Sequence, residues 1–263
     1  MPHGPFARQV ALHLWQRVLQ EDGDACVLPQ VIPHFMKTAT GTPIPWDAPL
    51  CSEEAPSVGR LLDAATCILG GSKVDVVTID MPVSREQITS RRVADDAISR
   101  EFGAAKCGTH SPSPERPGSH GEKLTRAFGD AGFDVATTGV KAGTLSCLVE
   151  VYPHPALLCL CNTETRLEYK CGKSRQYWPQ AGIPDRIAKL LDVYGYIIKS
   201  LDSEIEDIHL PLPTKGSCRT IAGLKRYEDA LDALVCAWVG CRYMDGHATP
   251  FGDATAAIWT PDA

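Results

Sequence analysis

The chain has 263 residues, of which 44% are hydrophobic and 22% charged, enough apolar content for one sizeable core or two small ones. This composition excludes a disordered or coiled-coil protein, and 22 Gly and 20 Pro without any period exclude a fibrous one. The formal net charge is -6, so a nucleic-acid partner would require a local basic surface or bound metal ions.

Membrane and secreted classes are also disfavoured. The start of the chain lacks the apolar core of a secretory signal, and the longest apolar helical stretch, residues 233–241, is far below the ~18 residues that cross a bilayer. We therefore expect a cytoplasmic protein with no membrane partner and with reduced thiols on its 11 cysteines. Protein partners are not indicated.

The first quarter of the chain contains a predicted helix, a proline-rich stretch and a second predicted helix. Apolar residues at helical spacing predict a helix over 6–20, whereas six prolines between residues 26 and 56 argue against any regular element there. Ser57 then precedes a periodic apolar run that stops at Gly70, which predicts a capped helix. We expect residues 1–56 to form a divergent N-terminal region.

The middle of the chain alternates strands and helices. Residues 74–80 are β-branched and mostly apolar, which predicts a strand that Met81-Pro82 ends. A charged helix is predicted over 91–102, followed by a loop over 103–121. The continuous apolar run 145–152 predicts a strand covered on both faces.

The last third is predicted to be mostly helical. Apolar periodicity indicates helices over 185–200 and 223–244, and a short edge strand is predicted over 256–260. Alternating strands and helices without an internal repeat predict one compact α/β unit.

Two strand residues are candidate site carboxylates. Asp80 lies at the carboxyl end of a predicted buried strand, where α/β sheets present ligand-binding groups; the alternative is a turn residue before proline. Glu150 interrupts an apolar strand, where an ionised carboxylate needs a cation or a donor. The alternative for Glu150 is an edge strand with its side chain in water.

A second pair of carboxylates lies on the last predicted helix. Asp229 and Asp232 are three residues apart and so share a helix face; the alternative is that they are solvated and complement the helix dipole. With Asp80 and Glu150, they would supply the hard oxygen ligands that Mg²⁺ or Mn²⁺ prefers. Such ions can drive phosphodiester hydrolysis when several carboxylates converge.

Six phrases of the sequence resemble, in this order, the domain-of-unknown-function 429 family, regarded as predicted nucleases of the RNase H-like fold. They are VVTIDMP, RRVADDAISR, LVEVYPHPAL, RLEYK, YEDALDALVCAW and AAIWTP, which together span roughly residues 74–261.

The resemblance implies residue roles. It implies that the catalytic metal-binding set is Asp80, Glu150, Asp229 and Asp232, and that substrate phosphates are bound by Arg92, Arg100 and Lys170. An alternative for Arg92 and Arg100 is surface ion pairing with Asp96, because these three residues are spaced four apart.

The sequence departs from the family at its start. Family members usually begin with a strand carrying a Gly-Val-Asp-like phrase whose Asp joins the site, but residues 1–73 contain no such phrase. The nearest candidates are Asp24 and Asp47. We therefore expect the first strand to be absent or altered. The alternatives are that the strand is lost, that the true start lies upstream, or that another residue supplies the acid.

The charge pattern offers one further indication of a polyanionic substrate. Residues 166–189 contain six basic residues against two acidic ones, together with Tyr169, Tyr177 and Trp178, which can stack on bases. A solvated loop with buried aromatic residues is the alternative.

These observations and the resemblance lead to one expectation for the fold and two for the function. We expect an RNase H-like α/β domain over 57–263, with a mixed central sheet flanked by helices. We expect a Mg²⁺- or Mn²⁺-dependent nuclease acting on nucleic acid or another phosphodiester. The alternative is a catalytically impaired RNase H-like domain that acts as a binding or interaction module.

Overall fold

The computed structural model describes most of the chain beyond residue 56. The described residues are 57–69, 71–113, 119–205, 208, 210–214, 218 and 220–262. The predicted helix over 6–20, the proline-rich segment 26–56, and both Asp24 and Asp47 lie outside these ranges.

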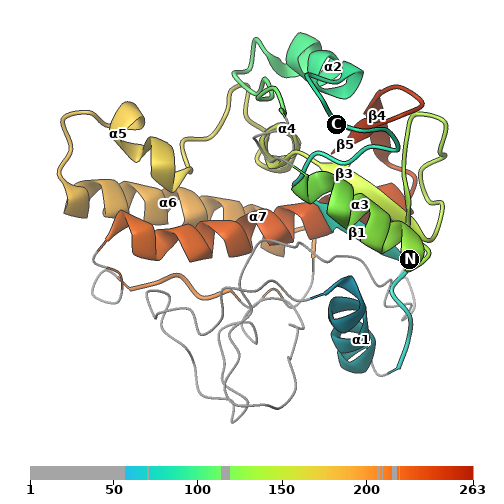
Figure 1. Ribbon diagram of the computed structural model, residues 1–263. Coiled ribbons are helices and arrows are strands. Elements are labelled where there is room, and N and C mark those ends of the chain that lie inside the picture. The colour runs from blue at the N-terminus through green and yellow to red at the C-terminus, as the bar shows by residue number, and fades with distance from the viewer. Residues whose placement is uncertain are drawn as a thin grey trace.

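A mixed sheet of five strands forms the centre of the described structure (Figure 1). The strand order is β1-β3-β5-β4, and β2 also pairs with β3. All pairings are parallel except that of β4 with β5. The strands are β1 (Val76–Ile79), β2 (Asp134–Val135), β3 (Cys147–Val151), β4 (Ala248–Gly252) and β5 (Ala257–Pro261).

Helices cover the sheet, and the two longest, α6 and α7, lie side by side and extend beyond it (Figure 1). The helices are α1 (Val58–Ile68), α2 (Val93–Phe102), α3 (His120–Asp130), α4 (Pro153–Leu160), α5 (Ser174–Tyr177), α6 (Ile183–Asp202) and α7 (Ile221–Met244), with a 3₁₀ turn at Cys171–Lys173. This arrangement confirms the predicted α/β class with a mixed sheet flanked by helices. It is consistent with an RNase H-like fold.

The alternation of side chains along the strands divides the core into two faces. Val76 and Val149 pack into the cluster that contains α4, α6 and α7. Val77, Ile79 and Leu148 pack on the other face with α1 and α3. Because successive residues of a strand point to opposite faces, Asp80 follows the α7 face and Glu150 follows the opposite one.

Local signals in the sequence explain several helix ends. The Ser57 hydroxyl accepts a hydrogen bond from the backbone N–H of Arg60 at 3.3 Å, so the predicted cap of α1 is confirmed. Thr220 caps α7 in the same way, accepting from the backbone N–H of Gly223 at 3.0 Å. Pro153 ends β3 as predicted, and it also begins α4.

Two broader expectations can be compared with the described residues. No helix in these ranges is long and apolar enough to cross a membrane. No disulfide joins any two of the nine cysteines that the structure describes.

Candidate metal centre

Asp80 lies where the first described strand meets α7. It is the residue directly after β1, it is partly buried, and α7 packs against this strand. Its position follows from the strand pattern, because the apolar run VVTI stays inside the sheet and the polar residue comes at its carboxyl end.

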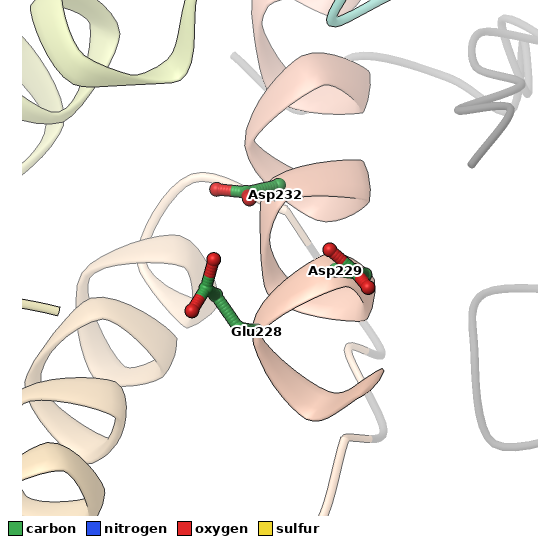
Figure 2. A group of neighbouring side chains, drawn as sticks. All are labelled: Glu228, Asp229 and Asp232. Carbon is green, nitrogen blue, oxygen red and sulfur yellow. The ribbon is translucent and has the colours of Figure 1, made fainter. Parts of the chain in front are cut away.

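Helix α7 brings three carboxylates to the same place. Glu228, Asp229 and Asp232 each offer one oxygen, and these oxygens all lie within 4.8 Å of one another, a spacing that could hold a metal ion. Figure 2 shows Glu228 and Asp232 on one flank of α7 and Asp229 on the other. This placement follows helix geometry, because residues four apart lie above one another on the same face.

Two neighbouring residues of the 161–173 segment hold Asp232 in place. The Tyr169 hydroxyl donates to Oδ1 of Asp232 at 2.7 Å, and Nζ of Lys170 donates to Oδ2 at 2.5 Å. Nζ of Lys170 also lies 3.5 Å from Oε1 of Glu228, whose Oε2 accepts from the backbone N–H of Cys171 at 2.6 Å. The segment therefore supplies donors to both carboxylates on that flank.

Lys225 is a second lysine, besides Lys170, whose ammonium contacts the cluster. It pairs with Asp229, and its Nζ lies 3.0 Å from Oε1 of Glu228. Burial raises the pKa of Asp229, and Lys225 opposes that rise. Burial by itself would lower the pKa of Lys170, but Asp232, Glu228 and Asp80 hold it above its ordinary value.

The cluster is negative when all its carboxylates are ionised. Asp80, Glu228, Asp229 and Asp232 contribute four negative charges, and Lys170 and Lys225 contribute two positive ones, which leaves two negative charges. Burial, with repulsion from Asp232, raises the pKa of Asp80 to about 7. In the absence of a further cation, the site therefore tends to take up a proton on Asp80.

Glu150 makes a different set of contacts. Its Oε1 and Oε2 accept from Nη2 and Nη1 of Arg92 at 2.7 Å and 2.6 Å, and Oε2 also accepts from the backbone N–H of Val83 at 3.0 Å. Burial raises the pKa of Glu150, while Arg92 opposes that rise. The predicted need of this carboxylate for a cation is thus met by Arg92.

All five donors of the Arg92 guanidinium have partners. Besides the two bonds to Glu150, Nη1 donates to the carbonyl of Val83 at 2.9 Å, and Nε and Nη2 each donate to Asp95 at 3.0 Å. Both backbone polar groups of Val83 are therefore bonded, which fixes the turn that follows Asp80. Arg92 keeps no donor for a phosphate in this arrangement.

The other sequence candidates on α2 lie on the surface. Arg100 is exposed in the last turn of α2. Asp96 pairs at 2.5 Å with Nε of Arg91. Arg92 and Asp95 therefore supply the buried polar contacts at the start of α2, while Ala94 and Ile98 supply its apolar ones.

Sequence reasoning missed two participants in the cluster. Glu228 was not selected, although its spacing of four residues from Asp232 is the usual signal of a shared helix face. Tyr169 was considered only as a stacking residue, because no sequence signal joins it to an acid 63 residues away.

Comparison with known proteins gives one match. A family model described as a protein of unknown function (DUF429) matches residues 15–256. The chain belongs to the DUF429 family. The DUF429 match begins upstream of the resemblance noted over residues 74–261 and includes much of the N-terminal region. No curated protein and no solved structure matches the chain.

Proposed function

We propose that this DUF429 protein is a metal-dependent phosphodiester hydrolase, with nucleic acid as its substrate and Mg²⁺ or Mn²⁺ as its metal. The supporting observation is the group of three α7 carboxylates, Glu228, Asp229 and Asp232, with Asp80 near enough for the charge of Asp232 to raise its pKa. Their excess of two negative charges equals the charge of one divalent cation, and carboxylate oxygens are the ligands that these ions prefer.

The donor set therefore fits a hard divalent cation. Glu228, Asp229 and Asp232 would hold it, with Asp80 near Asp232. Such an ion, when bound, would supply an activated water and a positive charge for the leaving oxygen of a phosphodiester. The hydrogen bonds from Tyr169 and Lys170 orient Asp232, so its two oxygens are fixed before any substrate arrives.

We assign Glu150 and Arg92 to positioning. Their bonds to both backbone groups of Val83 hold the turn after Asp80, and therefore hold the Asp80 carboxylate over the end of β1. We assign two roles to Lys170. Its ammonium holds the carboxylates of Glu228 and Asp232, and from the same position it would contact a substrate phosphate that approaches the cluster.

A non-catalytic binding module is the second candidate. The observation in its favour is that Lys170 already places a cation 2.5 Å from Asp232 and 3.5 Å from Glu228. An internal ammonium at that position would compete with a metal ion. A module of this kind would bind no divalent cation at the cluster.

Cleavage of labelled single-stranded RNA and DNA tests the proposal. The full chain is assayed with Mn²⁺, with Mg²⁺ and with EDTA, beside Asp80→Asn, Asp232→Asn and the control Asp192→Asn, which removes an exposed carboxylate from α6. We expect metal-dependent cleavage that falls at least about 100-fold in both site variants and stays unchanged in the control. Equal activity in all four proteins would refute the site. No cleavage and no Mn²⁺ binding by calorimetry would favour the binding module.

A further inference from the structure

The acidic cluster has a buried side and an exposed side. The side chains of Glu228 and Asp232 are only 3% and 4% exposed. Those of Asp229 and Lys225 are 32% and 51% exposed. Asp229 also lies on the other flank of α7 from the two buried carboxylates (Figure 2). A ligand that arrives from solvent therefore meets Lys225 and Asp229 first.

Lys170 holds the buried side in a fixed arrangement. Its Nζ lies 2.5 Å from Oδ2 of Asp232 and 3.5 Å from Oε1 of Glu228, and only 20% of its side chain is exposed. The ring of Tyr169 packs against the same ammonium, with 4.6 Å from Nζ to the ring centroid. An ammonium with these three neighbours has little freedom to change partners.

Lys225 is held much less firmly. Its two partners, Glu228 at 3.0 Å and Asp229, lie three and four residues further along the same helix. Exposed ion pairs of this spacing have little net strength, because water competes for both charges and the long lysine side chain loses freedom when it pairs. The ammonium of Lys225 can therefore exchange its partners at low cost.

The charge balance of the cluster gives Lys225 a second use. Without a metal ion, two ammonium groups face four carboxylates, so both are needed. With a divalent ion bound, the total charge would be zero, and an ammonium at the same oxygens would be repelled. Oxygens of Glu228 and Asp229 belong to the group that could hold the ion, so Lys225 would have to release them. Its ammonium would then be available beside the site for the negative charge of a phosphate.

We propose that Lys225 is a phosphate-binding residue of the candidate metal centre, and that its ammonium exchanges Asp229 for a phosphate of the nucleic acid when the cluster holds a divalent ion. This inference rests on the proposed hydrolase function and adds a substrate contact on the exposed side of the cluster to the one assigned to Lys170. Metal and nucleic acid then bind with positive coupling, because each favours the release of Lys225 from Asp229.

Two affinities of the full chain are measured separately. Calorimetry gives its affinity for Mn²⁺ alone. Fluorescence anisotropy, in saturating Mn²⁺ and in EDTA, gives its affinity for a labelled single-stranded phosphorothioate oligonucleotide, whose linkages keep their charge and resist cleavage. The variants are Lys225→Gln and Lys225→Arg. The matched control is Lys199→Gln, which removes an exposed ammonium from the last turn of α6.

We expect Lys225→Gln to change the two affinities in opposite directions. Its affinity for Mn²⁺ should rise at least about threefold, because a competitor for Asp229 is gone. Its affinity for the oligonucleotide in Mn²⁺ should fall at least about fivefold, and the slope of log K against log salt should decrease by about 0.7, the value for one phosphate contact on a single strand. In EDTA, the loss of oligonucleotide affinity should be no larger than in the control.

The other two variants separate the charge from its position. Lys225→Arg keeps a positive charge that can bind phosphate, so its oligonucleotide affinity in Mn²⁺ should stay within about twofold of wild type. Lys199→Gln removes a charge that lies on another helix, so both affinities should stay within about twofold of wild type.

Two results would overturn the role of Lys225. One is an oligonucleotide affinity in Mn²⁺ that falls no further in Lys225→Gln than in Lys199→Gln. The other is an affinity for Mn²⁺ that does not rise in Lys225→Gln. Failure of the hydrolase proposal would look different, because neither the wild type nor Lys225→Gln would then bind Mn²⁺, and both proposals would fall. Mn²⁺ binding that Asp232→Asn abolishes would keep the metal centre even where the Lys225 results fail.

Discussion

Asp80→Asn should make the protein more stable at neutral and alkaline pH when divalent ions are absent. Burial, with repulsion from Asp232, raises the pKa of Asp80 from 3.8 to about 7. Below about pH 4 the carboxyl is protonated in both the folded and the unfolded chain. As the pH rises from about 4 to about 7, the unfolded chain releases this proton first, so the free energy of unfolding falls, and above about 7 the loss is complete.

The size of the effect follows from the shift. At about 1.36 kcal/mol per pKa unit, a rise from 3.8 to about 7 corresponds to about 4 kcal/mol. This value is an upper limit, because Asp80 is only partly buried and solvent screens its charge. Asparagine has nearly the same shape and no charge, so it avoids the whole cost.

Urea unfolding in EDTA measures the difference directly. The gap in unfolding free energy between Asp80→Asn and wild type should be small near pH 4 and should increase to as much as about 4 kcal/mol near pH 8. The control Asp192→Asn, on the exposed side of α6, should show no such trend. Saturating Mn²⁺ should narrow the gap, because the ion binds the ionised wild-type site. A gap that stays flat with pH, or a variant less stable than wild type near pH 8, would refute the reasoning.

Three further predictions concern the residues around Asp80. Arg92→Met should lower the free energy of unfolding in urea by about 3 to 5 kcal/mol, because it leaves Glu150 buried without its cation. Adding Glu150→Gln should recover part of this loss. A double variant that is no more stable than Arg92→Met would contradict the prediction. Lys170→Met removes an ammonium that competes with a metal ion for Asp232, so the affinity for Mn²⁺ measured by calorimetry should rise at least about fivefold. An unchanged affinity would argue against this competition. Tyr169→Phe should cost about 1.5 to 3 kcal/mol in thermal or urea unfolding through the lost bond to a charged acceptor, and a neutral effect would show that Lys170 alone holds Asp232.

The sequence was informative wherever a local pattern decides the structure. The apolar run before Asp80 predicts the strand, and the Ser57 cap and the apolar periodicity of α7 predict two helices that are confirmed. Strands β2 and β4 were missed. β2 has only two residues, and β4 contains a proline and ends in glycine, which weakens the strand pattern.

The composition of the cluster depends on contacts between distant residues. Glu150 was grouped with Asp80 because both are strand carboxylates, and β1 and β3 do pair with Ile79 opposite Glu150. One residue of difference in register is enough to send the two side chains to opposite faces of the sheet. Which face α7 covers is settled by tertiary packing, so the contacts of Asp232 with Tyr169 and Lys170 were not readable from spacing.

The contacts around the acidic cluster differ from those of an ion-pair network that serves stability alone. An internal ion-pair network that served only stability would satisfy its members, as Arg92 does with Glu150 and Asp95. His154 instead keeps a buried nitrogen without a partner, and Arg166 does the same. Each such group costs about 1 to 3 kcal/mol, against a total stability of about 5 to 15 kcal/mol for an ordinary domain. The acidic cluster, with four carboxylates against two ammonium groups, is likewise not neutralised by Lys170 and Lys225, which supports the proposed divalent cation.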